Sequence, residues 1–315
     1  MKNYWLICLL SLASCGGGNN GPDEPTGPQV VKPSIGLNEK WEGSESSGPI
    51  GEWTNTNSLA GDEMDRTRDI FYGRTQLNTQ ELKVYDLIWE TVQNYSVAGN
   101  IGPYQQMAYF QDPLKVSYES FQNILAFFNA DCPFFFHTVA LIPNIVNDQL
   151  TSLSISYRYP RLEYDQKYAA MLKGVDKILS QLPQGLTEYE KVKFLHDEFL
   201  TSVSYSMQQG SEGDLYGAFV LKKIVCEGYA HGFQYLLQRA GIQAIYIEGR
   251  AFSNGEQIMH AWNMVRIDGK YYLADTTWDD LQTGFSYNYF LKSSATMSDH
   301  VPNAKYPLPE CNEDY

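Results

Sequence analysis

The chain has 315 residues, of which 43% are hydrophobic and 19% are charged, a composition typical of a folded globular protein. This length is enough for one large domain or two small ones with a substantial core. The formal net charge is −14, and because an acidic surface repels phosphate backbones we expect no nucleic-acid partner.

The N-terminal residues have the pattern of an export signal. Lys2 provides a positive start, and the apolar run that follows, from Trp5 to Leu12, is too short to span a bilayer. The sequence Leu-Ala-Ser-Cys at residues 12–15 resembles the lipobox of bacterial lipoproteins. The resemblance implies a signal peptide over residues 1–14, acylation of Cys15, and a bacterial membrane-anchored lipoprotein facing the periplasm or cell exterior. An ordinary signal peptide with an incidental cysteine is the alternative.

Residues 15–64 are rich in Gly, Pro, Asn, Ser and Glu, a composition that cannot bury a core. We interpret them as a flexible tether between the lipid anchor and the folded part of the chain.

Three cysteines remain beyond the predicted lipidation site, namely Cys132, Cys226 and Cys311. An odd number cannot pair completely within one chain, so at least one thiol is free. A disulfide between Cys132 and Cys226 stays open as an alternative. No CxxC motif or His/Cys cluster indicates zinc, and we predict neither a metal nor a cofactor.

Hydrophobic periodicity predicts a mixed α/β lead-in over residues 65–186, without a catalytic motif of its own. We expect helices at 78–95, 116–130 and about 164–182, and β-rich segments at 134–142 and 150–159. The next helix begins after Thr187, because Thr-Glu-Tyr-Glu at residues 187–190 fits a capping box. His196 lies beside the apolar stripe of that helix, and we interpret it as structural rather than catalytic.

Cys226 opens the helix that carries the main chemical signal. Apolar side chains recur on one face from Cys226 to Ala240, and Gly241 is a natural stop. Free N–H groups and the helix dipole at the first turn favour a thiolate. Taken alone, a lone cysteine in such a place is equally well explained by inert packing.

A reactive thiol needs a base, and the chain has five histidines. His231 lies on the same helix as Cys226 but about 140° around its axis, so the two side chains diverge. His260 instead opens a predicted strand over 260–267. Asp-Gly at residues 268–269 is a strong hairpin signal, and a second strand is expected over 270–276.

The two-residue turn defines the register of this hairpin. Ile267 pairs with Lys270, and counting back along both strands places Trp262 opposite Asp275. His260 shares the face of Trp262. His260 and Asp275 are therefore diagonal neighbours, with Cβ atoms roughly 7 Å apart.

Cys226, His260 and Asp275 thus fit a nucleophile, a base and an orienting acid. Asn263 has the opposite parity and points away, which argues against it as the orienting group. The thiol would attack a carbonyl carbon and form a thioester, while backbone N–H groups at the helix start would stabilise the oxyanion.

These segments resemble the bacterial transglutaminase-like superfamily. The motifs are Cys-Glu-Gly-Tyr-Ala at 226–230, His-Ala-Trp-Asn at 260–263, Ile-Asp-Gly-Lys-Tyr-Tyr at 267–272 and Asp-Thr-Thr-Trp-Asp-Asp at 275–280. The resemblance extends over about 187–292 and includes the order Cys, His, Asp. It implies an α+β, papain-like catalytic core over 187–315, in which the Cys-bearing helix packs on an antiparallel sheet that carries His260 and Asp275.

An aromatic residue upstream of the cysteine often completes the oxyanion hole in related folds. Tyr205 and Tyr216 are candidates for that role or for the substrate groove, and Trp262 is a candidate wall of the site. Structural packing is the alternative for each of these three residues.

The implied activity is that of a cysteine hydrolase or peptidase acting through a Cys-His-Asp triad. For an exported lipoprotein we favour hydrolysis of amide bonds, with a peptide, a protein or a peptidoglycan stem as substrate. One alternative is a protein cross-linking transglutaminase, and another is a non-catalytic binding or scaffold module of the same fold. The acids Asp275, Asp279 and Asp280 would be calcium ligands in a further alternative.

Overall fold

The computed structural model of the 315-residue chain describes residues 34–35, 70–93, 104–208, 213–253, 255–281, 283–303 and 306–315. The predicted signal peptide, Cys15 and all of the predicted tether except Ser34–Ile35 lie outside the described residues. Within the described ranges, no helix is both long enough and apolar enough to cross a membrane.

The chain divides into two compact units. Among the described residues, the first unit comprises 34–35, 79–93, 104–121 and 137–165. The second comprises 70–78, 122–136 and the described residues from 166 to 315.

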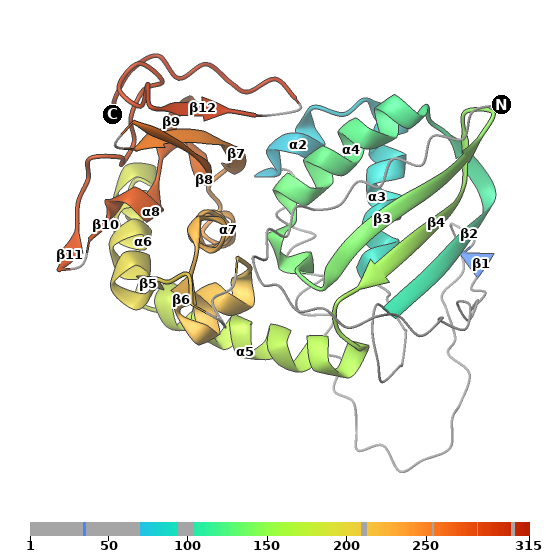
Figure 1. Cartoon of the computed structure of the whole chain (residues 1–315), viewed down its shortest axis with the longest axis horizontal. Helices are drawn as coiled ribbons and strands as arrows, with labels where there is room; N and C mark the ends of the chain where they lie inside the picture. The colour runs from blue at the N-terminus through green and yellow to red at the C-terminus, as the bar shows by residue number, and fades with distance from the viewer. Residues whose placement is uncertain are drawn as a thin grey trace, which may run out of the picture. The chain divides into compact units, whose positions relative to one another are not determined.

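The first unit contains a four-stranded sheet with the order β1-β2-β4-β3. Its strands are β1 (Ser34–Ile35), β2 (Tyr104–Lys115), β3 (Thr138–Val146) and β4 (Gln149–Tyr157), and β2, β4 and β3 lie side by side in Figure 1. Helix α3 (Thr79–Gln93) confirms the helix predicted over 78–95.

The alternation predicted in β4 is confirmed, because Leu153, Ile155 and Tyr157 are fully buried. The strand predicted over 134–142 begins later than expected, since Pro133–Phe135 form a 3-10 turn, η2, with proline at its first position. Strand β3 therefore starts only at Thr138.

Two helices contain residues of both units, α4 (Tyr118–Asp131) and α5 (Arg161–Leu179). They confirm the helices predicted over 116–130 and about 164–182. Helix α5 begins earlier than expected because it follows Pro160 directly, and proline is well suited to the start of a helix.

The second unit is built around an antiparallel sheet with the order β12-β7-β8-β9. Its strands are β12 (His300–Pro302), β7 (Ala244–Ser253), β8 (Glu256–Ile267) and β9 (Lys270–Ala274). Figure 1 shows helix α7 (Cys226–Arg239) nearly end-on beside β7 and β8.

Further helices and strand pairs belong to this unit. They are α2 (Tyr72–Thr75), α6 (Glu188–Ser202), α8 (Thr276–Asp279), a π-helical turn η3 (Gly217–Leu221), and the strand pairs β5 (Ser204–Tyr205) with β6 (Lys223–Ile224) and β10 (Asp280–Leu281) with β11 (Gly284–Phe285).

The predicted signals at the helix ends are confirmed. Thr187 accepts a hydrogen bond from the Glu190 backbone N–H, and the Glu190 carboxylate accepts one from the Thr187 N–H, which completes the capping box of α6. Gly241 follows α7 with φ +80°, a left-handed conformation that favours glycine.

The predicted hairpin register is confirmed. Ile267 pairs with Lys270, and the ladder continues to Asn263 opposite Ala274. Asp268 (φ 49°) and Gly269 (φ 85°) both have positive φ, as a type I′ turn requires.

Alternate residues of β8 face two different cores. Ala261 packs with Ala230 and Tyr246 on the side of α7, and Asn263 donates its side-chain amide to the Ala230 carbonyl at 3.0 Å. On the opposite face, Trp262 joins a buried cluster. The Cys-bearing helix thus packs on the antiparallel sheet, as predicted.

Gly249 lets strand β7 lie against the Trp262 ring. A Cβ at this position would come within 2.3 Å of the Val301 carbonyl oxygen and 2.5 Å of the Trp262 ring. Neither the backbone oxygen nor the buried indole can move aside cheaply.

We predict that Gly249→Ala lowers the free energy of unfolding by about 1–3 kcal/mol, because the added methyl overpacks the interface of β7 with Trp262 and β12. Ser253→Ala, at the exposed end of the same strand, is the control and should stay within about 0.5 kcal/mol of the wild type. Equal urea midpoints for the two variants would contradict the prediction.

Candidate active site

Cys226 is the first residue of α7 and its side chain is partly exposed. Val225, the residue before the helix, has an extended backbone and provides no capping side chain. The capping position therefore supplies no side-chain oxygen to the N–H groups of this first turn, which suits them to an oxyanion.

His260 lies between an acid and the thiol. Its Nε2 is 2.7 Å from Asp275 Oδ2, and Cys226 is close enough to raise the pKa of the ring. Since Asp275 occupies Nε2, Nδ1 is the nitrogen left for the thiol. A thiol, an imidazole and a carboxylate therefore lie near one another at the positions that the sequence predicts.

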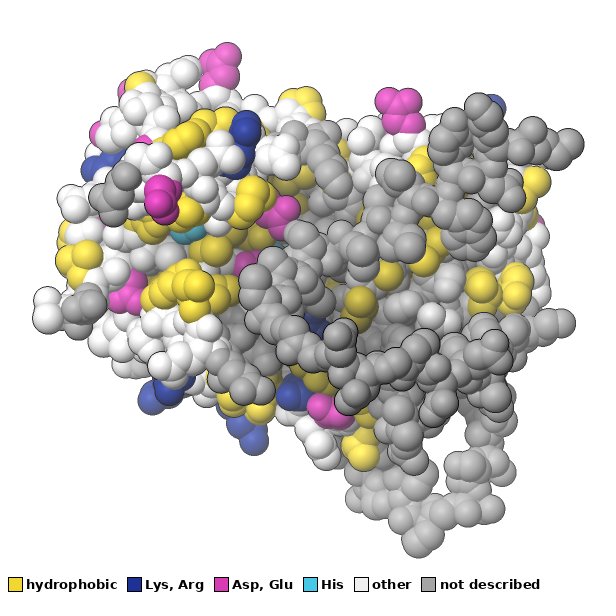
Figure 2. Space-filling view, viewed as in Figure 1, with side chains coloured by type: hydrophobic (Ala, Val, Ile, Leu, Met, Phe, Trp, Pro, Cys, Tyr) yellow, Lys and Arg dark blue, Asp and Glu magenta, His cyan; other side chains and the backbone are white. Residues whose placement is uncertain are grey.

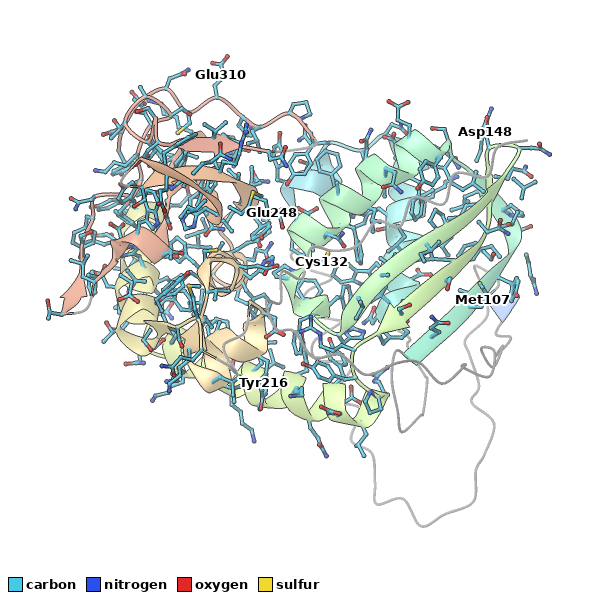
Figure 3. The ribbon with its side chains drawn as sticks, in the orientation of Figure 1. Met107, Cys132, Asp148, Tyr216, Glu248 and Glu310 are labelled. Atoms are coloured by element: carbon cyan, nitrogen blue, oxygen red, sulfur yellow. The ribbon has the colours of Figure 1, made fainter. Side chains whose placement is uncertain are left out.

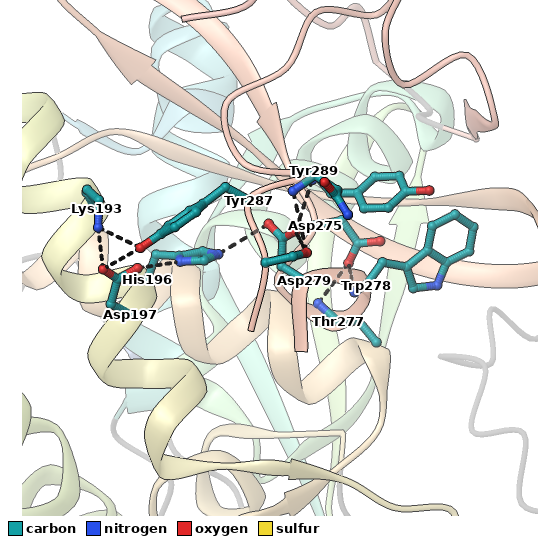
Figure 4. Close-up of polar contacts among 11 residues, drawn as sticks. Lys193, His196, Asp197, Asp275, Thr277, Trp278, Asp279, Tyr287 and Tyr289 are labelled. Carbon is teal, nitrogen blue, oxygen red and sulfur yellow. Dashed lines mark hydrogen bonds and ion pairs between the residues drawn. The ribbon is translucent and has the colours of Figure 1, made fainter. Parts of the chain in front are cut away.

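Asp275 is completely buried and caps helix α8. Its Oδ1 accepts hydrogen bonds from the backbone N–H groups of Thr277 at 2.8 Å and Trp278 at 3.2 Å. The predicted strand over 270–276 is shortened for this reason, because β9 ends at Ala274 and the chain turns into α8. Figure 4 shows this capping contact.

The electrostatics favour a charged pair. Burial alone would lower the pKa of His260, but its hydrogen bonds to Asp275 and Cys226 outweigh burial and raise that pKa to about 9. Burial would likewise raise the pKa of Asp275, yet the hydrogen bonds from His260 and His300 lower it. An ionised acid therefore faces a readily protonated imidazole.

Aromatic rings enclose the imidazole of His260. Trp278 stacks on it with ring centroids 5.1 Å apart, and Trp262 lies at 6.1 Å. His260 is 5% exposed, and histidine contributes very little of the surface seen in Figure 2. These rings limit water at the His260–Asp275 hydrogen bond.

The three predicted groove residues occupy different places. The ring of Tyr205 is half-exposed, and both burial and the charge of Cys226 raise its pKa, which puts it close to the thiol. Trp262 is buried beside His260. Tyr216, labelled in Figure 3, packs instead beneath Lys167 of α5, with the ammonium 4.1 Å from its ring centroid.

A second histidine, His300, contacts Asp275 and was not predicted from the sequence. His300 Nε2 lies 3.1 Å from the same Oδ2 that His260 contacts, and His300 Nδ1 lies 2.7 Å from Asp299 Oδ1. Its strand, β12, has three residues and no alternating pattern of its own. No local signal identifies it, because its position depends on pairing with β7.

His196 forms a separate buried pair with Asp279, which lies one helical turn after Asp275 in the sequence. Its Nε2 lies 3.3 Å from Asp279 Oδ2 and its Nδ1 lies 2.9 Å from Asp197 (Figure 4). Burial opposes its charge, but these two carboxylates outweigh burial and raise the pKa of His196. The contacts attach α6 to α8, which accords with the structural role expected for His196.

The three acids of the calcium alternative face different partners. Asp275 contacts two histidines, Asp279 accepts from the Ser286 hydroxyl and the Tyr289 N–H, and Asp280 accepts from the Tyr229 hydroxyl. Their carboxylates are held by separate neighbours rather than gathered around one centre.

Metal-type ligands come together at one place in the described part of the chain. His260, Asp275 and His300 offer atoms within 4.8 Å of one another. The hydrogen bonds from both histidines to Asp275 already account for this grouping. Cys132, Cys226 and Cys311 are free thiols, so the disulfide alternative between Cys132 and Cys226 is wrong.

Comparison with known proteins supports the predicted family. Residues 178–276 match the family model of the Transglutaminase-like superfamily. The Kyphoscoliosis peptidase of Homo sapiens is 27% identical over 181 residues, and that of Mus musculus is 26% identical. These matches cover 50% of this chain but only 27% of each relative.

Two solved structures are also similar. A TGase is 15% identical with a TM-score of 0.34, covering 71% of this chain and 62% of that chain. The periplasmic domain of TgpA from Pseudomonas aeruginosa is 16% identical with a TM-score of 0.26, covering 42% and 55%.

The matched region carries Cys226, His260 and Asp275 on an α+β core in which a helix packs on an antiparallel sheet. Residues 178–276 are thus similar to the transglutaminase-like superfamily, and the fold is of the transglutaminase-like, papain-like class.

We predict that His260 makes stability depend on pH in the alkaline range. Its folded pKa of about 9 lies above the unfolded value of about 6.5. The stability from its contacts is therefore fully present below pH 6.5 and lost as the pH rises through 9, at no more than about 1.4 kcal/mol per pH unit.

Urea unfolding of the wild type and His260→Gln between pH 6 and about 10 tests this dependence. The difference in unfolding free energy between the two proteins should shrink as the pH rises. A constant difference across the range would contradict the prediction.

Proposed function

We propose that the chain is a cysteine hydrolase that cleaves amide bonds by acyl transfer through Cys226, His260 and Asp275. The observation that carries the proposal is the position of the buried His260, whose Nε2 lies 2.7 Å from Asp275 Oδ2 and whose pKa is raised by the nearby Cys226. A thiol, an imidazole and a carboxylate in that order can activate a nucleophile and protonate a leaving group.

In the proposed reaction, Cys226 gives its proton to His260 and attacks the carbonyl carbon. The C–S bond forms, and N–H groups at the start of α7 stabilise the negative oxygen. The C–N bond then breaks, and His260 returns the proton to the leaving amine. Water, deprotonated by His260, then attacks the thioester carbonyl, the C–S bond breaks, and His260 returns the proton to the Cys226 sulfur as the acid is released.

We favour peptides, proteins or peptidoglycan stems as substrates, because the predicted export signal would place the enzyme outside the cytoplasm. This preference depends on the predicted location outside the cytoplasm as well as on the residues of the site. Resolution of the same thioester by an amine would make the chain a cross-linking transglutaminase. The same fold without turnover would serve as a binding or scaffold module.

We predict that Cys226→Ala abolishes amide hydrolysis while the protein stays folded, because the residue is partly exposed and its loss removes one sulfur from the helix start. Peptide libraries and isolated cell-wall stems, incubated with wild type and variant and analysed by mass spectrometry, measure this. Cys132→Ala is the control, because Cys132 is buried outside the proposed site. Equal turnover by wild type and Cys226→Ala would exclude the proposed nucleophile.

The fate of the thioester is decided by competition between water and an amine. Wild type is incubated with a glutamine-containing peptide and a labelled primary amine. The hydrolase proposal expects release of the acid with little label incorporated. Efficient incorporation of the amine would favour the transglutaminase, and absence of both products with every substrate tested would favour the binding module.

We propose further that the protein is a lipoprotein anchored through Cys15. The support is the lipobox-like sequence at residues 12–15. Intact-mass analysis of membrane-extracted protein should show an N-terminus at Cys15 that carries a lipid, and Cys15→Ala should release the protein from the membrane fraction. Recovery of unlipidated wild type would overturn the anchor.

A further inference from the structure

The Asp275 carboxylate has a neighbour that the proposed reaction does not use. His300 Nε2 lies 3.1 Å from Asp275 Oδ2, the oxygen that also contacts His260 at 2.7 Å. His300 is 6% exposed and Asp275 is completely buried. In this low-dielectric surrounding, the contact acts directly on the acid that orients His260.

His300 faces a carboxylate at each ring nitrogen. Its Nδ1 lies 2.7 Å from Asp299 Oδ1, and the Tyr289 hydroxyl donates to the other oxygen of Asp299 at 3.1 Å. Ionised carboxylates only accept hydrogen bonds. Both contacts can be hydrogen bonds at the same time in the form of His300 in which each ring nitrogen carries a proton.

The His300 ring is held in this orientation by its strand and by two indoles. Residue 300 pairs with Ala251 of β7. Trp278 and Trp262 pack edge-on against the ring, with centroids 4.6 and 4.9 Å away. The ring of His260 is 5.6 Å from that of His300. The ring of His300 is thus held near the proposed base.

We propose that His300 is a positioning residue that acts through Asp275. It holds the carboxylate in place for His260 and, as a second cation on the same oxygen, weakens the hold of Asp275 on the His260 proton. This inference rests on the proposed function, in which His260 must release that proton to the leaving amine.

The expected effect has a definite sign. The charged or titratable groups that face His260 are Asp275, Cys226 and His300, and those that face His300 are Asp275, Asp299, Tyr289 and His260. Burial and the bond to Asp299 raise the pKa of Tyr289 to about 12, so it stays neutral. Without a positive charge at His300, the negative charge of Asp275 acts on His260 alone. The protonated form of His260 is then more stable, so the pKa of His260 rises further.

Three variants separate charge from packing. His300→Gln keeps a donor that can reach Asp275 but removes the charge. His300→Phe keeps the ring and removes both donor and charge. Asp299→Asn keeps an oxygen acceptor for Nδ1 but removes the carboxylate that favours a protonated His300. Its effect on His260 should therefore be in the same direction as that of the His300 variants but smaller.

The first measurement is the titration midpoint of the His260 ring by NMR in protein with labelled histidine, assigned by comparison with His260→Gln. We expect the midpoint to rise by about one pH unit in both His300 variants and by less in Asp299→Asn. The second is the pH profile of kcat. We expect its alkaline limb to move up with the midpoint, and kcat near neutral pH to fall by about tenfold in His300→Phe and less in His300→Gln.

A purely structural role would lower the unfolding midpoint without moving the His260 titration. An unchanged titration midpoint in folded His300→Gln therefore overturns the inference, even if His300→Phe fails to fold. The NMR midpoint does not require turnover. If the wild type has no activity but the His260 titration midpoint still shifts in the His300 variants, the proposed function is wrong. The effect of His300 on His260 would nevertheless stand.

Discussion

Four hydrogen bonds converge on the buried carboxylate of Asp275, and the rest of the site depends on them. Two come from the first turn of α8 and two from His260 and His300. The acid thereby connects strand β8, helix α8 and strand β12 through a single side chain. A buried charge is tolerated only when its lone pairs are satisfied in this way, so loss of any one partner affects the other three.

The position of the thiol depends on how closely α7 approaches the sheet. Ala230 on the helix and Ala261 on β8 are small enough to pack together, and Asn263 bridges the two elements by donating to the Ala230 carbonyl. The same small-residue packing recurs where Gly249 lies against Trp262. The helix start that carries Cys226 is therefore positioned by close backbone packing rather than by a capping side chain.

The family match ends at residue 276, just after Asp275, whereas Asp299 and His300 lie beyond it. The matched region accounts for a cysteine, a histidine and an acid in the expected order. The support behind the acid comes from the C-terminal part of the chain. His196 and Asp279 add a second buried pair that anchors α8 to α6. Elements distant in sequence thus support Asp275 from two sides, β12 through His300 and α6 through the contact of His196 with α8.

Local patterns in the sequence were sufficient for the features that short-range physics decides. The Asp268-Gly269 turn defines the register that brings His260 and Asp275 together, and the capping residue Thr187 marks the start of α6, because each depends on a few adjacent residues. Strands β2 and β7 and the partner of Tyr216 were not predictable in this way. Only the tertiary structure decided that His300 shares Asp275, because β12 has three residues and acquires its place by pairing with β7 across the fold.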